Sequence, residues 1–143
     1  SDLAMLAIWT GQPASSKAYL LALSRWQATQ AKPYKAAMQQ LQIVVEACLA
    51  ALGKGNTQAS IDQISEYDRQ LAQFSIDTGL NFYNPTHLAR RKQVELARCV
   101  YKPSGAGGGD FGIAYSINKT DIQNLAESLE RQGIYTFPLI VQS

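Results

Sequence analysis

Runs of apolar residues without polar interruption predict strands at both ends of the chain. Residues 3–9, LAMLAIW, form one such run, which is typical of a buried strand. Shorter runs at 99–101 and 111–117 predict two more strands, and 134–141 is expected to close the chain as a fourth. Pro138 cannot donate a ladder hydrogen bond, so the fourth strand is predicted to lie at an edge of the sheet.

The middle of the chain is predicted to be helical, because apolar residues recur there at every third or fourth position. Four helices are expected between the first two strands, over about 15–30, 33–53, 57–79 and 85–97. The strongest periodic pattern belongs to the second helix and comprises Leu41, Val44, Val45, Cys48, Leu49 and Leu52. A fifth helix is expected from Thr120 to Gly133, since Thr120 and Gln123 have the spacing of a capping box.

The predicted order of elements is β-αααα-β-β-α-β. Without the additional helices it reduces to βαββαβ, the ferredoxin-like plan of an antiparallel sheet with helices on one face. A length of 143 residues suits one domain with its own core. The sequence therefore predicts a single α+β, ferredoxin-like domain with extra helices inserted.

Composition and charge argue against two classes of partner. The net charge is +2 and the basic residues are scattered, which is too weak a field to suggest nucleic acid. The longest basic run, residues 90–92, lies in a helical pattern and is interpreted as a solvated face. No apolar stretch is expected to reach the roughly 20 residues of a membrane span, so no membrane partner is predicted.

Cysteine and histidine usage limits the available chemistry further. Cys48 and Cys99 lie in apolar patterns and are interpreted as buried thiols of a reducing compartment, which predicts a cytoplasmic protein. His87 is the only histidine, so a zinc site or a histidine-based triad has little support. Any chemistry here must rely on backbone amides, Lys, Ser and Asp.

The stretch Lys102–Gly112, KPSGAGGGDFG, places four glycines between positions 105 and 109. Three interpretations compete: a flexible linker, a tight hairpin, and a loop whose bare backbone amides approach an anion. The stretch lies between two apolar runs, which disfavours a linker, and a hairpin needs fewer glycines. A P-loop is excluded because no Lys follows the glycines at the required place. A phosphate-binding loop of another type is the favoured interpretation.

Two segments resemble a known family. Residues 104–114, SGAGGGDFGIA, resemble the third signature motif of the GHMP kinase superfamily, and the preceding Lys and Ser with the GGGD ending resemble its phosphomevalonate kinase branch. Residues 8–16, IWTGQPASS, resemble the segment that opens the C-terminal half of those kinases. Phe111 departs from the small residue of the family pattern and Pro103 replaces a small polar one, which puts loop geometry and substrate fit in doubt.

The resemblance implies that residues 1–143 are a GHMP kinase C-terminal domain, with the N-terminal nucleotide-cradling domain as its missing partner. It further implies transfer of the γ-phosphoryl of ATP to 5-phosphomevalonate, giving 5-diphosphomevalonate, with Mg²⁺ accompanying ATP. This chain alone is then expected to be inactive. Two alternatives stay open: another GHMP small-molecule kinase, and a non-catalytic ferredoxin-like domain that binds a regulatory ligand.

Candidate residues for binding the phosphorylated substrate and ATP gather in these two segments. They are Ser15, Ser16, Lys102, Ser104, Gly105, Ala106, Gly107, Gly108, Gly109 and Asp110. The glycines would offer backbone amides, Lys102 a point charge, and the two serines a helix N-terminus suited to anions. Asp110 is a candidate for a Mg²⁺-linked or loop-orienting role; no residue is assigned as catalytic base or as metal ligand. Capping, a turn and a solvated lysine are the structural alternatives.

Overall fold

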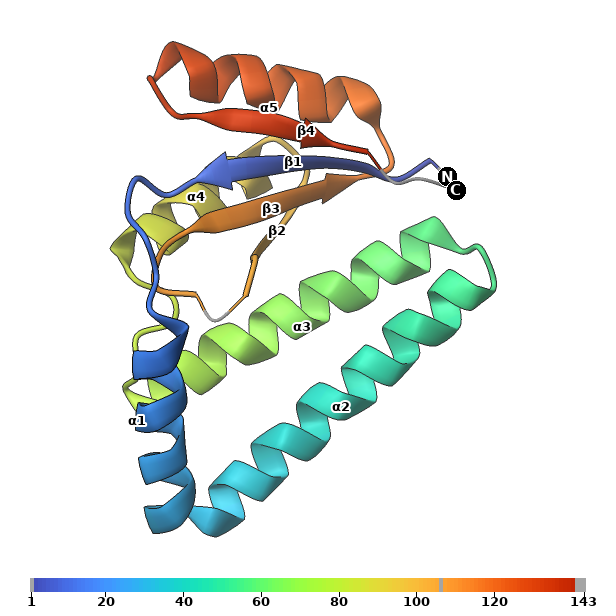
Figure 1. The fold of residues 1–143 in the computed structure, drawn as a ribbon. Helices are drawn as coiled ribbons and strands as arrows, with labels where there is room; N and C mark the ends of the chain where they lie inside the picture. The colour runs from blue at the N-terminus through green and yellow to red at the C-terminus, as the bar shows by residue number, and fades with distance from the viewer. Residues whose placement is uncertain (1, 106, 141–143) are drawn as a thin grey trace.

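The computed structural model describes residues 2–105 and 107–140. Its helices are α1 (Ser16–Thr29), α2 (Ala31–Gly53), α3 (Thr57–Thr78), α4 (Pro85–Leu96) and α5 (Lys119–Arg131). Its strands are β1 (Ala4–Trp9), β2 (Val100–Pro103), β3 (Phe111–Ser116) and β4 (Thr136–Leu139). The order of elements along the chain is the predicted one (Figure 1).

The four strands form one antiparallel sheet in the order β2-β3-β1-β4. This is the strand order of a ferredoxin-like βαββαβ sheet, so the predicted α+β fold is confirmed. β4 lies at an edge, as Pro138 predicted, and Pro138 pairs there with Leu6. β1 is central and pairs with β3 from Ala4↔Ser116 to Trp9↔Phe111.

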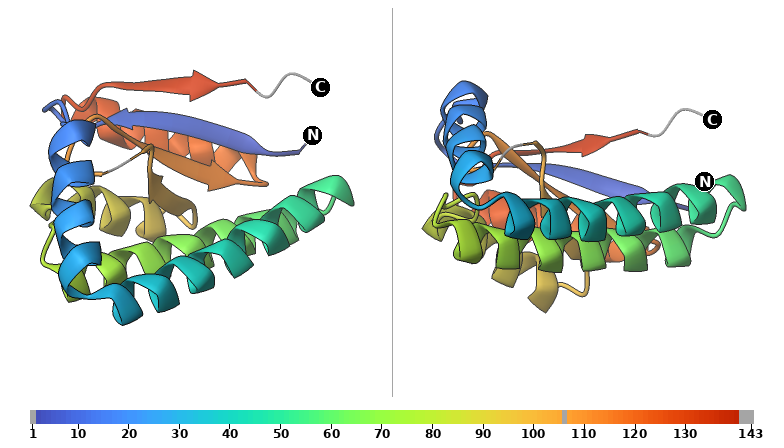
Figure 2. Two further views of the ribbon diagram at one scale, coloured as in Figure 1. Left: turned by 60° about the horizontal axis from the view of Figure 1, so that its bottom comes forward. Right: turned by 90° about the horizontal axis from the view of Figure 1, so that it is seen from below.

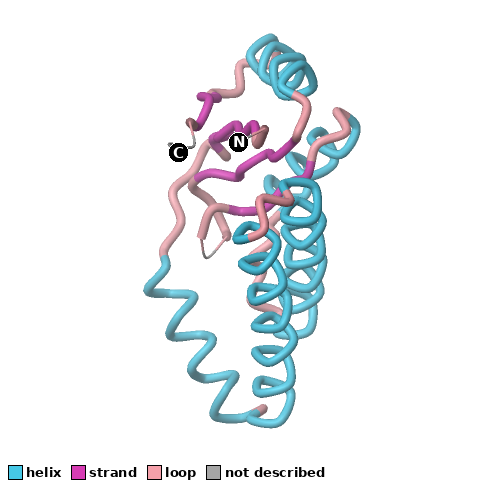
Figure 3. Tube along the Cα trace, turned by 90° about the vertical axis from the view of Figure 1, so that its right-hand side faces the viewer, coloured by secondary structure: helices cyan, strands magenta, loops and turns pink. Residues whose placement is uncertain are grey.

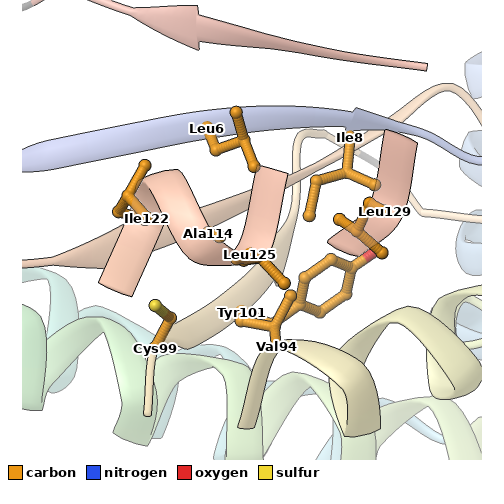
Figure 4. Packing of buried hydrophobic residues seen from close by; sticks show 9 residues of the cluster. All are labelled: Leu6, Ile8, Val94, Cys99, Tyr101, Ala114, Ile122, Leu125 and Leu129. Atoms are coloured by element: carbon orange, nitrogen blue, oxygen red, sulfur yellow. The ribbon is translucent and has the colours of Figure 1, made fainter. Parts of the chain in front are cut away.

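One face of the sheet carries the main core. Side chains alternate between the two faces of a strand, so Leu6 and Ile8 of β1 point to the same side as Ala114 of β3. α5 and α4 cover this side; their buried contributions are Ile122, Leu125, Leu129 and Val94 (Figure 4). The α5 side chains recur at positions 122, 125 and 129, which places them on one helical face.

α3 lies beside β2, α2 packs against α3 on the side away from the sheet, and α1 stands at one end of this pair (Figures 1 and 2). Figure 3 shows the sheet and α5 as one unit from which these helices project. Only Leu41 and Val44 of α2 are buried. Val45, Leu49 and Leu52 belong to the same predicted apolar face but are 42%, 62% and 50% exposed. α3 covers one side of that face, and no described residue covers the rest.

α2 also differs from the expectation about membrane spans. By length and composition alone it is apolar enough to cross a bilayer, and little of its most apolar part is buried in the protein. The expectation that no stretch reaches this length is therefore wrong. One such helix is weak evidence, because core helices and signal sequences meet the same criterion.

Two helix starts differ from prediction. α5 begins at Lys119 with Asn118 as its N-cap, whose side chain accepts a hydrogen bond from the Thr120 N–H at 2.9 Å. Asn is at least as good an N-cap as Thr, so the earlier residue takes the cap and the predicted capping box does not form. α2 begins at Ala31 and not at Pro33, which shortens the link from α1 to the single residue Gln30.

A second, aromatic cluster joins the projecting helices to the segment before α4. Phe74 of α3 stacks on Phe82 with ring centroids 5.8 Å apart, and Trp26 of α1 meets Phe74 edge-on at 5.4 Å. Tyr19 packs against Phe82 from the start of α1. Trp26 is thus a packing residue. Cys99 is buried and Cys48 half-buried, both as free thiols.

Candidate functional site

The glycine loop connects β2 to β3 and is closed by a hydrogen bond from the Ser104 N–H to the Phe111 carbonyl at 2.9 Å. Gly105, Gly107 and Gly108 have φ of +144°, +78° and +76°, a region that glycine occupies at little cost. Asp110 also has a positive φ, of 55°. The backbone conformation here is one that few residue types other than glycine adopt readily.

Close packing is a second reason for glycine in this loop. A Cβ on Gly107 would lie 2.5 Å from the Phe82 carbonyl oxygen, and one on Gly109 would lie 2.7 Å from the Pro13 carbonyl oxygen. A Cβ on Gly108 would collide with the Tyr19 hydroxyl. The loop is therefore wedged between the start of α1 and the segment before α4, and part of its glycine content is structural.

Asp110 ties the loop to the segment between β1 and α1. Its Oδ1 accepts a hydrogen bond from the Ala14 N–H at 3.0 Å, and its own N–H donates to the Gln12 carbonyl at 2.8 Å. The Thr10 hydroxyl donates to the Asp110 carbonyl at 2.7 Å. These bonds bring together the two segments that the sequence singled out, which lie about a hundred positions apart.

Ser15 and Ser16 stand directly beyond this tether at the N-terminus of α1. Ser15 is the N-cap, and its side chain accepts a hydrogen bond from the Ala18 N–H at 3.3 Å. Ser16 is the first helical residue, and both are exposed. The positive end of the α1 dipole thus lies beside the glycine loop, an arrangement that favours an anion.

Lys102 takes a different direction. Its side chain lies over the Tyr67 ring, with Nζ 5.3 Å from the centroid, and Nζ donates to the Pro103 carbonyl at 2.8 Å. Burial lowers the pKa of this ammonium, mainly by desolvation. It lines an apolar groove of about 220 Å³ together with Cys48 and Tyr115. Its predicted contact with phosphate stays a prediction.

The remaining loop candidates differ in accessibility. Ser104 and Gly105 are exposed, Gly107 and Gly109 are buried, and Gly108 is half-buried. Ala106 lies outside the described residues. Within the part of the chain that is described, the N–H groups of Gly105 and Gly109 have no protein acceptor. Backbone donors in a loop of this kind can bind an anionic ligand.

Asn84 and His87, at the start of α4, were missed as partners of the loop. Asn84 Nδ2 donates to the Gly108 carbonyl at 2.8 Å. His87 is fully buried, with Nε2 3.1 Å from the Gly109 carbonyl oxygen and Nδ1 2.6 Å from the Tyr101 hydroxyl. A neutral imidazole satisfies both, with Nε2–H as donor, and desolvation lowers the His87 pKa. Asn before Pro predicts a helix start, but only the fold places it against the loop.

The two departures from the family pattern are both accommodated. Phe111 packs between Trp9 and Phe137, with ring centroids 4.9 and 5.3 Å away. Pro103 is buried and pairs with Gly112 in the sheet. Over residues 2–105 and 107–140, no group of three or more His, Cys, Asp or Glu side chains could hold a metal ion.

Comparison with known proteins bears on the resemblance. No family model matches the chain. The chain is 29% identical over 133 residues to phosphomevalonate kinase of Streptomyces sp. (strain CL190), which covers 92% of this chain and 36% of that protein. It therefore spans little more than a third of the curated relative.

Solved structures give the same picture of the fold. The Streptococcus pneumoniae phosphomevalonate kinase in complex with phosphomevalonate and AMPPNP matches with a TM-score of 0.76 and 24% identity, over 96% of this chain and 40% of that one. The L. major mevalonate kinase in complex with R-mevalonate matches with a TM-score of 0.83 and 15% identity, over 99% and 43%. The resemblance predicted from the glycine loop is thus confirmed: the chain has the α+β fold of a domain of the GHMP kinases, and its sequence is similar to that of a phosphomevalonate kinase.

Proposed function

We propose that this chain is the C-terminal domain of an ATP-dependent phosphomevalonate kinase. The complete enzyme would transfer the γ-phosphoryl of ATP to the phosphate of 5-phosphomevalonate, giving 5-diphosphomevalonate and ADP in the mevalonate pathway to isoprenoids. The observation that carries the proposal is the meeting of the GAGGGD loop and the N-terminus of α1, joined through Asp110. The 29% identity to a phosphomevalonate kinase supports the choice of substrate.

The chemistry of phosphoryl transfer suits this arrangement. Such a reaction needs little covalent help from the protein and depends on positioning and charge neutralisation. The amides of Gly105 and Gly109 and the first turn of α1 would bind phosphate oxygens of substrate or nucleotide. Mg²⁺, bound with ATP, supplies further charge neutralisation in reactions of this class. Asp110 would hold the loop and α1 in register, and its exposed carboxylate could in addition interact with the Mg²⁺ that accompanies ATP.

The rest of the enzyme belongs to the proposal as well. We infer an N-terminal domain that cradles the nucleotide, because the relatives are about two and a half times longer than this chain. Residues 1–143 alone are then expected to be inactive, and a separately supplied N-terminal domain is expected to restore activity. A cytoplasmic location is part of the same proposal.

A kinase assay on the full-length protein tests the substrate. We expect ATP-dependent formation of 5-diphosphomevalonate from 5-phosphomevalonate, detected by mass spectrometry, with kcat/KM at least a hundredfold above that for R-mevalonate, homoserine or galactose. Preference for one of those alcohols would replace the substrate with that of another GHMP kinase, an alternative that the structural similarity to mevalonate kinase keeps open. Binding of a small phosphorylated ligand without turnover of any substrate would instead favour a regulatory domain.

A further inference from the structure

The first turn of α4 holds two consecutive carbonyl groups of the glycine loop. The Asn84 side-chain amide donates to the Gly108 carbonyl at 2.8 Å, and His87 Nε2 lies 3.1 Å from the Gly109 carbonyl oxygen. Asn84 is 7% exposed and His87 0%. Burying a polar side chain costs free energy unless the side chain forms hydrogen bonds. Here the loop backbone provides a hydrogen-bond acceptor for both side chains.

Because these two carbonyl groups are held in place, the N–H groups of the same peptides are held in a fixed orientation as well. The peptide group is planar and no cis peptide bond occurs among the described residues, so the carbonyl and the N–H of one peptide point in opposite directions. The carbonyl held by His87 shares its peptide with the Asp110 N–H, which donates to the Gln12 carbonyl at 2.8 Å. By the same geometry, the carbonyl held by Asn84 directs the Gly109 N–H away from α4.

The Gly109 N–H is one of the loop donors for which residues 2–105 and 107–140 offer no acceptor. Gly109 is buried, and in the described part of the molecule its N–H has no acceptor, although the neighbouring Gly108 N–H donates to the Phe82 carbonyl at 2.8 Å. Buried backbone donors nearly always have an acceptor. An oxygen of a bound ligand would supply it.

We propose that Asn84 is a positioning residue of the phosphate site: through the Gly108 carbonyl, and supported by His87, it aims the Gly109 N–H at a phosphate oxygen of the ligand. The inference rests on the proposed function and deepens it by identifying a residue outside the glycine loop. Asn84 does not touch the ligand in this arrangement, and acts only through the peptide that it holds.

The two ends of the Asn84 side chain have separate partners, which allows a clean test. Its Oδ1 accepts a hydrogen bond from the His87 N–H at 3.0 Å and so caps α4, while its Nδ2 faces the loop. Asn84→Asp keeps the capping oxygen, which suits the positive end of the helix, but places an oxygen against the Gly108 carbonyl. The matched control is Asn56→Asp, because Asn56 caps α3 by accepting from the Ala59 N–H at 3.0 Å, far from the loop in sequence.

The experiment follows the Gly109 amide resonance of the ¹⁵N-labelled full-length protein during titration with inorganic pyrophosphate. We expect a saturable shift in the wild type and in Asn56→Asp. In Asn84→Asp the affinity is expected to fall at least tenfold. In the kinase assay, KM for 5-phosphomevalonate or ATP should rise at least tenfold in Asn84→Asp and change less than twofold in Asn56→Asp.

A second variant guards against the effect of a buried charge. Asn84→Ser is neutral and caps helices well, but its hydroxyl is too short to replace the amide donor. If either Asn84 variant folds and binds pyrophosphate as the wild type does, the inference is overturned and the kinase proposal stays intact. Loss of the fold in both variants would have the same consequence, because it would make Asn84 a structural residue. A wild-type protein that neither shifts with pyrophosphate nor turns over substrate would instead overturn the proposed function.

Discussion

α5 and α2 show how differently two helices of one chain can use an apolar face. α5 has 13 residues, and it buries Ile122, Leu125 and Leu129 against the sheet. α2 has 23 residues and a longer apolar pattern, yet buries only Leu41 and Val44. Periodicity predicts where an apolar face lies, but the tertiary structure decides whether anything covers it. The sheet with α5 is therefore expected to carry most of the stability, and the projecting helices little of it.

The largest expected difference between the two regions comes from matched leucines. Leu129 of α5 is 1% exposed and Leu49 of α2 is 62% exposed. Leu129→Ala should lower the free energy of unfolding by about 2–5 kcal/mol, because it leaves a cavity in a filled core. Leu49→Ala should change it by less than about 0.5 kcal/mol.

Urea denaturation of both variants and the wild type measures this contrast. Equal losses would mean that the exposed face of α2 is covered in the protein as it occurs, by a partner subunit or by a further part of the chain. That result would contradict the conclusion that the apolar face of α2 is uncovered while that of α5 is buried.

A smaller effect is expected where the projecting helices join the sheet region. The Tyr83 hydroxyl donates to the buried carboxylate of Asp68 in α3, and Arg91 of α4 pairs with the same carboxylate at 2.8 Å. Burial raises the pKa of Asp68, against the opposing effects of Tyr83 and Arg91. Tyr83→Phe removes a hydrogen bond to a charged group and should lower the free energy of unfolding by about 1.5–3 kcal/mol.

Tyr34→Phe is the matched control for this joint. Tyr34 packs on Trp26, and within the described residues its hydroxyl has no hydrogen-bond partner. Its substitution should leave the denaturation midpoint unchanged. If both variants behaved alike, the Asp68 cluster would contribute nothing to holding α3 against α4.

The smallest expected effect is a dependence of stability on pH through His87. Desolvation lowers the pKa of His87 in the folded protein below its ordinary value near 6.5. Below that pH the unfolded chain binds a proton that the folded protein does not, so stability falls as the pH falls. Between pH 7.5 and 5.5 the loss should be at most about 1.4 kcal/mol, the value for a group with an ordinary unfolded pKa that stays neutral in the folded protein.

The check is thermal or urea unfolding of the wild type and His87→Gln at both pH values. The variant should be less stable at pH 7.5 but show little change between the two, since the chain has no other histidine. A wild-type stability that is flat over this range would show that His87 is protonated as easily in the folded protein as in the unfolded chain.

The sequence by itself determined the elements, their order and the resemblance to the GHMP kinases. The apolar run of β1, the periodic helices and Pro138 at the sheet edge all follow from local patterns of side-chain chemistry, and the glycine loop carries the resemblance. Helix starts were less secure, because Asn118 and Thr120 are both competent caps and only the packed chain selects one.

Only the tertiary structure decided how the site is held. The tether from Asp110 to Ala14 spans 96 positions, and the contact from Asn84 to Gly108 spans 24. No local pattern encodes such pairs, because they depend on sheet pairing bringing β1 and β3 together and on α4 packing beneath the loop. His87 illustrates the reason: a lone histidine in a sequence has no partner to indicate its role, and the fold supplies two, the Tyr101 hydroxyl and the Gly109 carbonyl.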